Sequence, residues 1–115
     1  MTDQFHKVMA LADLPEGSMR DCTLDGRELV VCRTRDGAVY ALDNICSHAF
    51  ARMCEGRLRG TRLICPLHGA SFDIRDGRAL AAPASKPLAC HEARVRGPDV
   101  EVRLAAAATQ VTSPL

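Results

Sequence analysis

The chain has 115 residues, which is enough for one domain with a modest core but not for two. Charged residues make up 25% of it, are interspersed and leave a formal net charge of +1, so neither a basic face for nucleic acid nor an acidic tail is predicted. No apolar run approaches the ~18 residues of a membrane helix and no signal-peptide pattern opens the chain, so a cytosolic protein is expected.

Turn signals recur at short intervals, and each is flanked by residues that favour strands. In chain order they are Asp25-Gly26, Asp36-Gly37, Asp76-Gly77 and Gly97-Pro98-Asp99. This spacing predicts an all-β domain. Residues 39–43 ("VYALD") and 100–104 ("VEVRL") are expected to be strands, and the second alternates apolar and charged residues as a sheet with one dry face does.

Between residues 44 and 86 the pattern changes. Two short strand candidates, at 62–64 ("RLI") and 71–74 ("SFDI"), are separated by links that contain Gly and Pro. We therefore expect a small subdomain at about 44–86 within a domain of residues 1–104. The tail at 105–115 lacks periodicity and bulky apolar residues, so it is expected to be flexible.

The predicted subdomain contains two short segments that each offer one thiol and one imidazole. The first is Cys46-x-His48 and the second is Cys65-x-x-His68, with sixteen residues between them. In a zinc finger the two cysteines come together and then the two histidines. Here each loop offers one of each, which suits two irons bridged by sulfide, with thiolates on one iron and imidazoles on the other. A zinc ion in the same Cys2His2 set remains an alternative.

These residues resemble the motif of Rieske iron-sulfur proteins. The resemblance rests on Cys46-x-His48, on Cys65-Pro66-Leu67-His68-Gly69 and on the following "SFD" and Asp76-Gly77, and it covers nearly the whole chain. Length and architecture are similar to the small Rieske ferredoxins of bacterial ring-hydroxylating oxygenases. The resemblance implies the Rieske fold, an antiparallel β-sandwich with a cluster-binding subdomain.

The resemblance also implies roles for individual residues. One [2Fe-2S] cluster would be bound by Cys46 and Cys65 at the inner iron and by His48 and His68 at the outer iron. Ala82-Pro83 falls where the family has a proline loop over the cluster. No catalytic residue is expected, because the chain has no nucleophile with a base, no 2-His-1-carboxylate triad and no glycine-rich nucleotide loop.

Two positions bear on the reduction potential. High-potential Rieske proteins place a Ser directly after the motif glycine and a Tyr two residues later, where this chain has Ala70 and Phe72. Neither side chain donates a hydrogen bond to the cluster sulfurs, so we expect a potential toward the low end of the Rieske range of roughly −150 to +300 mV. The same branch has a disulfide between the loops, where this chain has Ala51 and Leu67, so no bridge is expected.

The other cysteines and histidines are expected to lie outside the site. Disulfides belong mainly to secreted proteins, so Cys22, Cys32 and Cys90 are interpreted as small buried hydrophobes and Cys54 as a structural or exposed thiol. His6 and His91 stand alone on strand-like segments and are interpreted as surface or hydrogen-bonded side chains.

The resemblance implies a monomeric electron carrier that is not itself an enzyme. It would take one electron from a flavin-containing, NAD(P)H-oxidising reductase and deliver it to a terminal Rieske oxygenase of an aromatic-hydrocarbon dioxygenase system. Both partners are expected to bind transiently at the His48/His68 face, which would include Phe50, Leu67 and Pro83. The alternatives are a fixed Rieske subunit, similar to the small subunit of nitrite reductase, and a zinc-stabilised interaction module.

Overall fold

The computed structural model describes residues 4–46, 51–67, 69–81 and 86–105. All of the pairings between its strands are antiparallel, as the resemblance to the Rieske fold implies, and the all-β architecture agrees with the turn pattern. The strands are β1 (His6–Ala10), β2 (Met19–Leu24), β3 (Arg27–Arg33), β4 (Val39–Asp43), β5 (Arg57–Arg59), β6 (Arg62–Ile64), β7 (Ser71–Asp73), β8 (Ala79–Ala81), β9 (Cys90–Arg96) and β10 (Asp99–Arg103). Two short 3-10 turns, η1 (Leu11–Asp13) and η2 (Met53–Glu55), complete the described elements.

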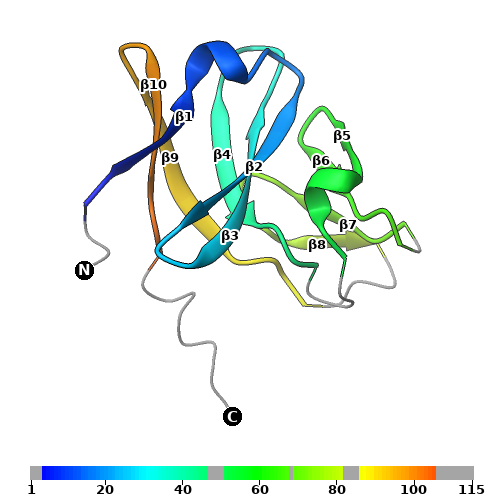
Figure 1. Cartoon of the computed structure of the whole chain (residues 1–115). Coiled ribbons are helices and arrows are strands. Elements are labelled where there is room, and N and C mark those ends of the chain that lie inside the picture. The colour runs from blue at the N-terminus through cyan, green and yellow to red at the C-terminus, as the bar shows by residue number, and fades with distance from the viewer. Residues whose placement is uncertain (1–3, 47–50, 68, 82–85, 106–115) are drawn as a thin grey trace.

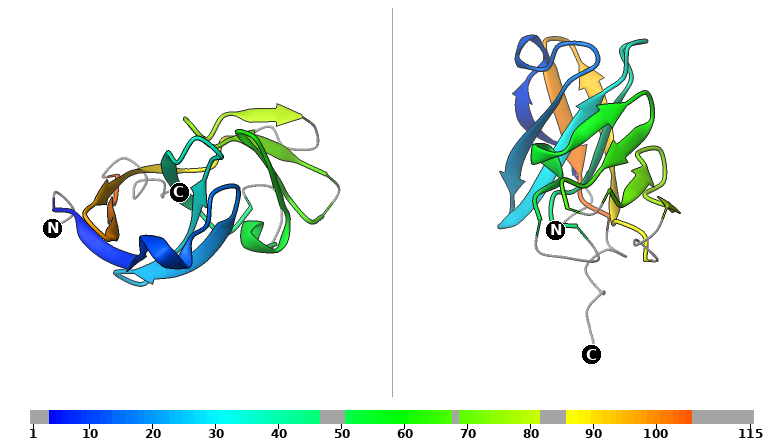
Figure 2. Two further views of the ribbon diagram at one scale, coloured as in Figure 1. Left: turned by 90° about the horizontal axis from the view of Figure 1, so that it is seen from above. Right: turned by 90° about the vertical axis from the view of Figure 1, so that its right-hand side faces the viewer.

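The larger sheet has six strands in the order β1-β10-β9-β4-β3-β2. Its two edge strands, β1 and β2, also contact each other, so the sheet curls into a near-barrel, which Figure 2 shows from above. The β2–β3 hairpin closes at Asp25-Gly26, where both residues have positive φ values of 52° and 77°. Such a turn matches the right-handed twist of the flanking strands.

The smaller sheet has four strands in the order β5-β6-β7-β8 and lies beside the near-barrel (Figure 1). All four strands fall within residues 57–81, inside the segment for which a subdomain is predicted. The predicted strands at 62–64 and 71–74 correspond to β6 and β7. The boundaries of the predicted domain and subdomain remain a prediction.

Strand β3 separates two apolar cores. Residues Leu29 to Cys32 are all fully buried, and alternate side chains point to opposite faces. Leu29 and Val31 belong to the core inside the near-barrel, whereas Val30 and Cys32 pack in a second core with side chains of the small sheet, including Phe72. The second core therefore joins the two sheets.

The C-terminal strand behaves as its alternation predicts. β10 begins one residue earlier than expected, at Asp99, and Val100, Val102 and Leu104 are buried in the core of the near-barrel. The tail from residue 106 lies outside the described residues. Among those that are described, no helix is long and apolar enough to cross a membrane.

Candidate metal centre

The two predicted ligand cysteines occupy matching places in two loops. Cys46 follows β4 by three residues, and Cys65 directly follows β6. The backbone N–H of Cys46 donates to the carbonyl of Ala51 at 2.9 Å, and that of Cys65 donates to the carbonyl of Ala70 at 2.7 Å. Each loop is therefore closed by a hydrogen bond from its cysteine to the residue five positions later.

The side chains of Cys46 and Cys65 are brought together in the core that joins the sheets. Only 5% of Cys46 and 2% of Cys65 is exposed, and the Cys46 side chain interacts with the Cys65 thiol. Burial raises the pKa of the Cys65 thiol, and the nearby Cys46 raises it further, while the N–H of Leu67, 3.5 Å from the sulfur, acts in the opposite direction. A metal that binds the Cys65 thiolate must therefore displace its proton.

Donor chemistry at this point fits an iron-sulfur cluster. Two adjacent thiols in a dry environment can ligate one iron, and a backbone N–H already directed at sulfur is the kind of contact that tunes a cluster. The predicted imidazole ligands His48 and His68 follow in the same two loops but lie outside the described residues, as do Phe50 and Ala82-Pro83.

Asn44 anchors the first loop, a role that the sequence analysis did not predict. Its side chain is fully buried, and its Oδ1 accepts the N–H of Cys54 at 2.8 Å. Its backbone carbonyl accepts the N–H of Met53 at 2.6 Å. These contacts hold the segment after the first loop against the strand that precedes it. An Asn at the end of a strand was the only signal in the sequence, and it is weak.

The loops also depend on a close backbone approach at Gly56. A Cβ atom at this position would lie 1.8 Å from the carbonyl oxygen of Ile64, the residue before Cys65. Only glycine permits this contact. The segment that follows the first loop can thus lie directly against the strand that leads into the second.

The remaining cysteines are all free thiols, although Cys32 is buried in the same core as Cys46 and Cys65 and Cys54 packs against that core. Cys32 is fully buried and Cys22 half-buried, and burial raises their pKa values to about 12 and about 11, so both thiols stay protonated. Cys90 is half-buried rather than buried, and its thiol donates to the carbonyl of Arg75. Cys54 is half-buried and bonded to Asn44, as expected for a structural thiol.

His91 is a buried, fully bonded side chain, as its isolated position in the sequence suggested. Its Nδ1 accepts the N–H of Ala105 at 3.0 Å, so its Nε2 donates to Asp43 at 2.9 Å. Asp43 also accepts two bonds from the guanidinium of Arg27. Burial opposes ionisation of Asp43, but the bonds from His91 and Arg27 outweigh it and lower the pKa of the carboxyl.

Residues 4–92 match the Rieske [2Fe-2S] domain family. The chain belongs to the Rieske [2Fe-2S] family. It is 38% identical to the ferredoxin component of the naphthalene 1,2-dioxygenase system of Pseudomonas aeruginosa, over 90% of this chain and 99% of that protein. The matched length means that the chain corresponds to the whole of that relative.

Solved structures of Rieske ferredoxins are similar as well. The ferredoxin of carbazole 1,9a-dioxygenase from Nocardioides aromaticivorans superimposes with a TM-score of 0.84 at 32% identity, over 90% of this chain and 100% of that one. A ferredoxin chain from a complex of reduced oxygenase and oxidised ferredoxin in carbazole 1,9a-dioxygenase superimposes with a TM-score of 0.80 at 33% identity. The match covers 86% of this chain and 92% of that one.

These relatives confirm the predicted Rieske fold and the predicted [2Fe-2S] cofactor. They are named as ferredoxin components, so the prediction that this Rieske protein is an electron carrier and not itself an enzyme is confirmed too. The individual ligands are not tested by these likenesses and remain a prediction.

Proposed function

We propose that this Rieske protein carries single electrons from a flavin-containing, NAD(P)H-oxidising reductase to the terminal Rieske oxygenase of an aromatic dioxygenase system. The observation that carries the proposal is the end-to-end match to a naphthalene dioxygenase ferredoxin component, 90% of this chain against 99% of the relative. A related ferredoxin is known in complex with its oxygenase, which supports the choice of acceptor.

In this proposal Cys46 and Cys65 ligate the inner iron, and His48 and His68 ligate the outer one. The cluster, when bound, accepts and releases one electron in each cycle. Buried surroundings at Cys46 and Cys65 exclude water from the thiolates, and the N–H of Leu67 supports negative charge on the Cys65 sulfur. The loop closures at Ala51 and Ala70 hold the two cysteines in place.

Both redox partners would dock in turn at the tip formed by the two loops. Ile45 and Leu67 are 37% and 42% exposed there, and with Ala51 and Pro66 they form the apolar part of a hollow of about 470 Å³ that Arg52 and Glu55 also line. A moderately apolar surface of this kind suits a brief encounter, so each contact is expected to bury no more than about 1,200 Å². Phe50 and Pro83 are proposed to extend the same face.

Two further features complete the proposal. The protein acts as a monomer, because a shuttle must release each partner. It works in the cytosol, which is supported by the free thiols of Cys22, Cys32 and Cys90 outside the proposed ligand set.

The cofactor is tested first on the isolated protein. We expect a red-brown protein with about two irons and two sulfides per chain and, after dithionite reduction, an EPR signal with the low average g of Rieske centres. His48→Cys should prevent assembly or lower the potential, because it adds a negative charge at the outer iron. A colourless protein with one zinc would refute the proposal, and an unchanged potential in an assembled His48→Cys variant would refute the ligand assignment.

Docking is tested by a pair of equally exposed side chains. Leu67 lies at the loop tip and Val95 on β9, and both are 42% exposed. Leu67→Asp should slow electron transfer from the reductase and to the oxygenase, measured by stopped flow, whereas Val95→Asp should leave both rates near wild type. Full rates for Leu67→Asp in both half-reactions would remove the tip from the interface. They would favour a fixed subunit that uses another surface.

A further inference from the structure

The hairpin of β5 and β6 carries a cationic outer face. In its register Arg57 lies opposite Ile64 and Arg59 lies opposite Arg62, while the intervening Leu58 and Leu63 form the inward pair. Because directly opposed residues share a face, the three arginines and Ile64 lie on one side of the hairpin. Leu63 is fully buried in the core on the other side, and the three arginines are exposed.

Several arginines elsewhere in the chain are paired with carboxylates. Arg75 and Arg78 both pair with Asp73, and Arg103 pairs with Glu92. Within the described residues, the guanidinium groups of the β5–β6 hairpin form no ion pair, and Arg62 donates to the hydroxyl of Ser71 at 3.4 Å.

The arrangement is locally unfavourable. Arg59 and Arg62 face each other directly across the hairpin, and like charges in this position destabilise a strand pair. A sequence that breaks such a local rule without compensation often does so at a functional surface. The chain has 15 Lys and Arg and 14 Asp and Glu residues. Without the three arginines and the neighbouring Glu55, 12 cationic residues stand against 13 acidic ones, so the excess of positive charge is concentrated here.

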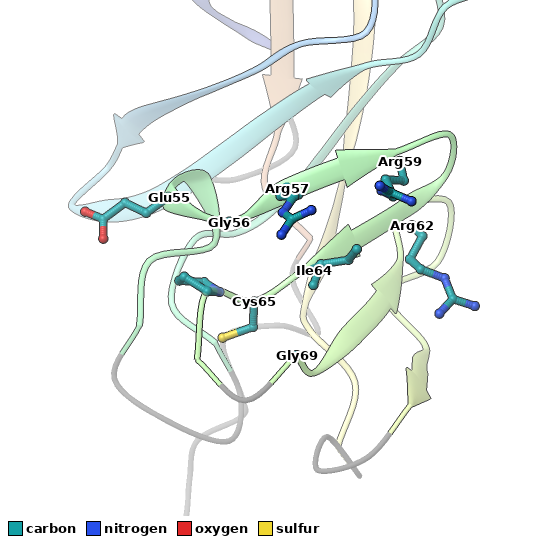
Figure 3. A pocket seen from close by; sticks show the side chains of 9 residues that line it. Glu55, Gly56, Arg57, Arg59, Arg62, Ile64, Cys65 and Gly69 are labelled. Atoms are coloured by element: carbon teal, nitrogen blue, oxygen red, sulfur yellow. The ribbon is translucent and has the colours of Figure 1, made fainter.

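This cationic face lies beside the proposed metal centre. The three arginines line a hollow of about 890 Å³ together with Glu55, Ile64 and Cys65, and Figure 3 looks into it. β6 ends at Ile64, and the next residue is Cys65. A protein seated on the hairpin would therefore lie directly against the segment that leads to a cluster ligand.

We propose that the outer face of the β5–β6 hairpin, formed by Arg57, Arg59 and Arg62, is an electrostatic docking surface for a carboxylate-rich surface of a redox partner. The inference rests on the proposed electron-carrier function and adds the charge of the partner and the place where it is recognised. It extends the docking area from the apolar loop tip along the hairpin. Cationic side chains of this kind raise the rate of encounter more than the final affinity.

The spread of the arginines favours a protein over a small anion. Figure 3 shows the three side chains distributed along the hairpin rather than converging on one point. A single phosphate or sulfate requires donors that meet around it, whereas an acidic protein surface can pair with several separated guanidinium groups.

The test follows oxidation of the reduced, cluster-loaded protein by two haem proteins of opposite charge. The acidic probe is the soluble domain of ferric cytochrome b5, and the basic probe is ferric cytochrome c. Second-order rates are measured by stopped flow from low ionic strength to about 1 M salt, where the Debye length falls to about 3 Å. The variants are Arg57→Gln, Arg59→Gln and the double variant. The matched control is Arg96→Gln, an exposed residue at the end of β9, which belongs to the other sheet.

For the acidic probe at low salt, Arg59→Gln should lower the rate about two- to threefold and the double variant about fivefold or more. The differences should vanish at high salt, the basic probe should not slow, and Arg96→Gln should change either rate by less than about 1.5-fold. Iron content and potential, measured on every variant, should match the wild type.

Three results would overturn the inference while leaving the proposed function intact. The first is a cluster-loaded wild type whose electron-transfer rate with cytochrome b5 does not depend on salt. The second is an equal loss of this rate in Arg59→Gln and Arg96→Gln. The third is saturable inhibition of the reaction by inorganic phosphate at constant ionic strength, which would indicate a small-anion site. A wild-type protein that binds no cluster would overturn the proposed function and the inference with it.

Discussion

Asn44 and Cys54 are joined by two hydrogen bonds across the base of the first ligand loop. The N–H of Cys54 donates to Asn44 Oδ1 at 2.8 Å, and Asn44 Nδ2 donates to the Cys54 sulfur at 3.4 Å. Ten residues separate the two, and Cys46 lies between them. The contact holds together the two ends of the segment that would supply half of the cluster ligands.

Asn44→Ala should destabilise this loop. The change leaves the Cys54 N–H without its acceptor, and an unsatisfied group of this kind costs about 1–3 kcal/mol. We expect a decrease of that size in the free energy of unfolding, measured by urea denaturation of the cluster-loaded protein, with faster loss of iron to a chelator. Cys54→Ala is the control, because it keeps the bond from the backbone N–H to Asn44 Oδ1 and removes the weaker one to sulfur. Equal effects of the two variants would contradict the anchoring role.

Gly56→Ala should be far more damaging than Gly60→Ala, although both glycines lie close together in the chain. At Gly56 a Cβ would lie 1.8 Å from the carbonyl oxygen of Ile64, whereas at Gly60 no atom lies within 4 Å. We expect a loss of at least about 3 kcal/mol, or failure to assemble the cluster, for Gly56→Ala. For Gly60→Ala, where φ is +59°, about 1 kcal/mol is expected. Thermal unfolding and iron content are measured for both variants. Similar losses of stability in the two would contradict the close approach of Gly56 to Ile64.

Asp73 should contribute to stability only above the acid range. The hydrogen bonds from Arg75 lower the pKa of its carboxyl to about 2. Because the folded pKa is depressed, this stability is present above the unfolded pKa of about 4 and is lost as the pH falls toward 2. Both guanidinium partners are more than half exposed, so solvent screening limits the effect to about 1 kcal/mol.

The comparison is between Asp73→Asn and the wild type in urea denaturation at several pH values. The variant should be less stable by about 1 kcal/mol at pH 7, and the difference should shrink toward zero near pH 2. Asp21→Asn, which removes an exposed carboxylate with no ion pair among the described residues, should change little at any pH. A pH-independent difference for Asp73→Asn would show that its carboxylate charge contributes nothing.

Ala70→Ser should raise the reduction potential. The added hydroxyl can donate a hydrogen bond to sulfur, which stabilises the more negative reduced state. Ser71→Ala is the control, because the side chain of Ser71 points to the opposite face of β7 from Phe72 and contacts Arg62. Protein-film voltammetry should show an upward shift for the first variant and none for the second. A wild-type potential near the top of the Rieske range would refute the prediction of a low potential from Ala70 and Phe72.

The sequence alone was sufficient to predict the family and the antiparallel strands, and it supplied the candidate ligands, which remain a prediction. These properties depend on local chemistry. Glycine turns and period-two alternation act over a few residues, and a thiol and an imidazole within one short loop are recognisable wherever the loop lies. For the same reason Val100, Val102 and Leu104 could be assigned to one buried face before the core was known.

Tertiary structure alone decided the contacts between segments distant in the chain. The sequence does not show that Gly56 must touch Ile64, that Asn44 bonds to Cys54, or that Cys46 and Cys65 share one core. It also does not show that Arg59 and Arg62 face each other without a carboxylate between them, because that depends on hairpin register. Charge and close packing act between neighbours in space, and only the folded chain determines which residues are neighbours.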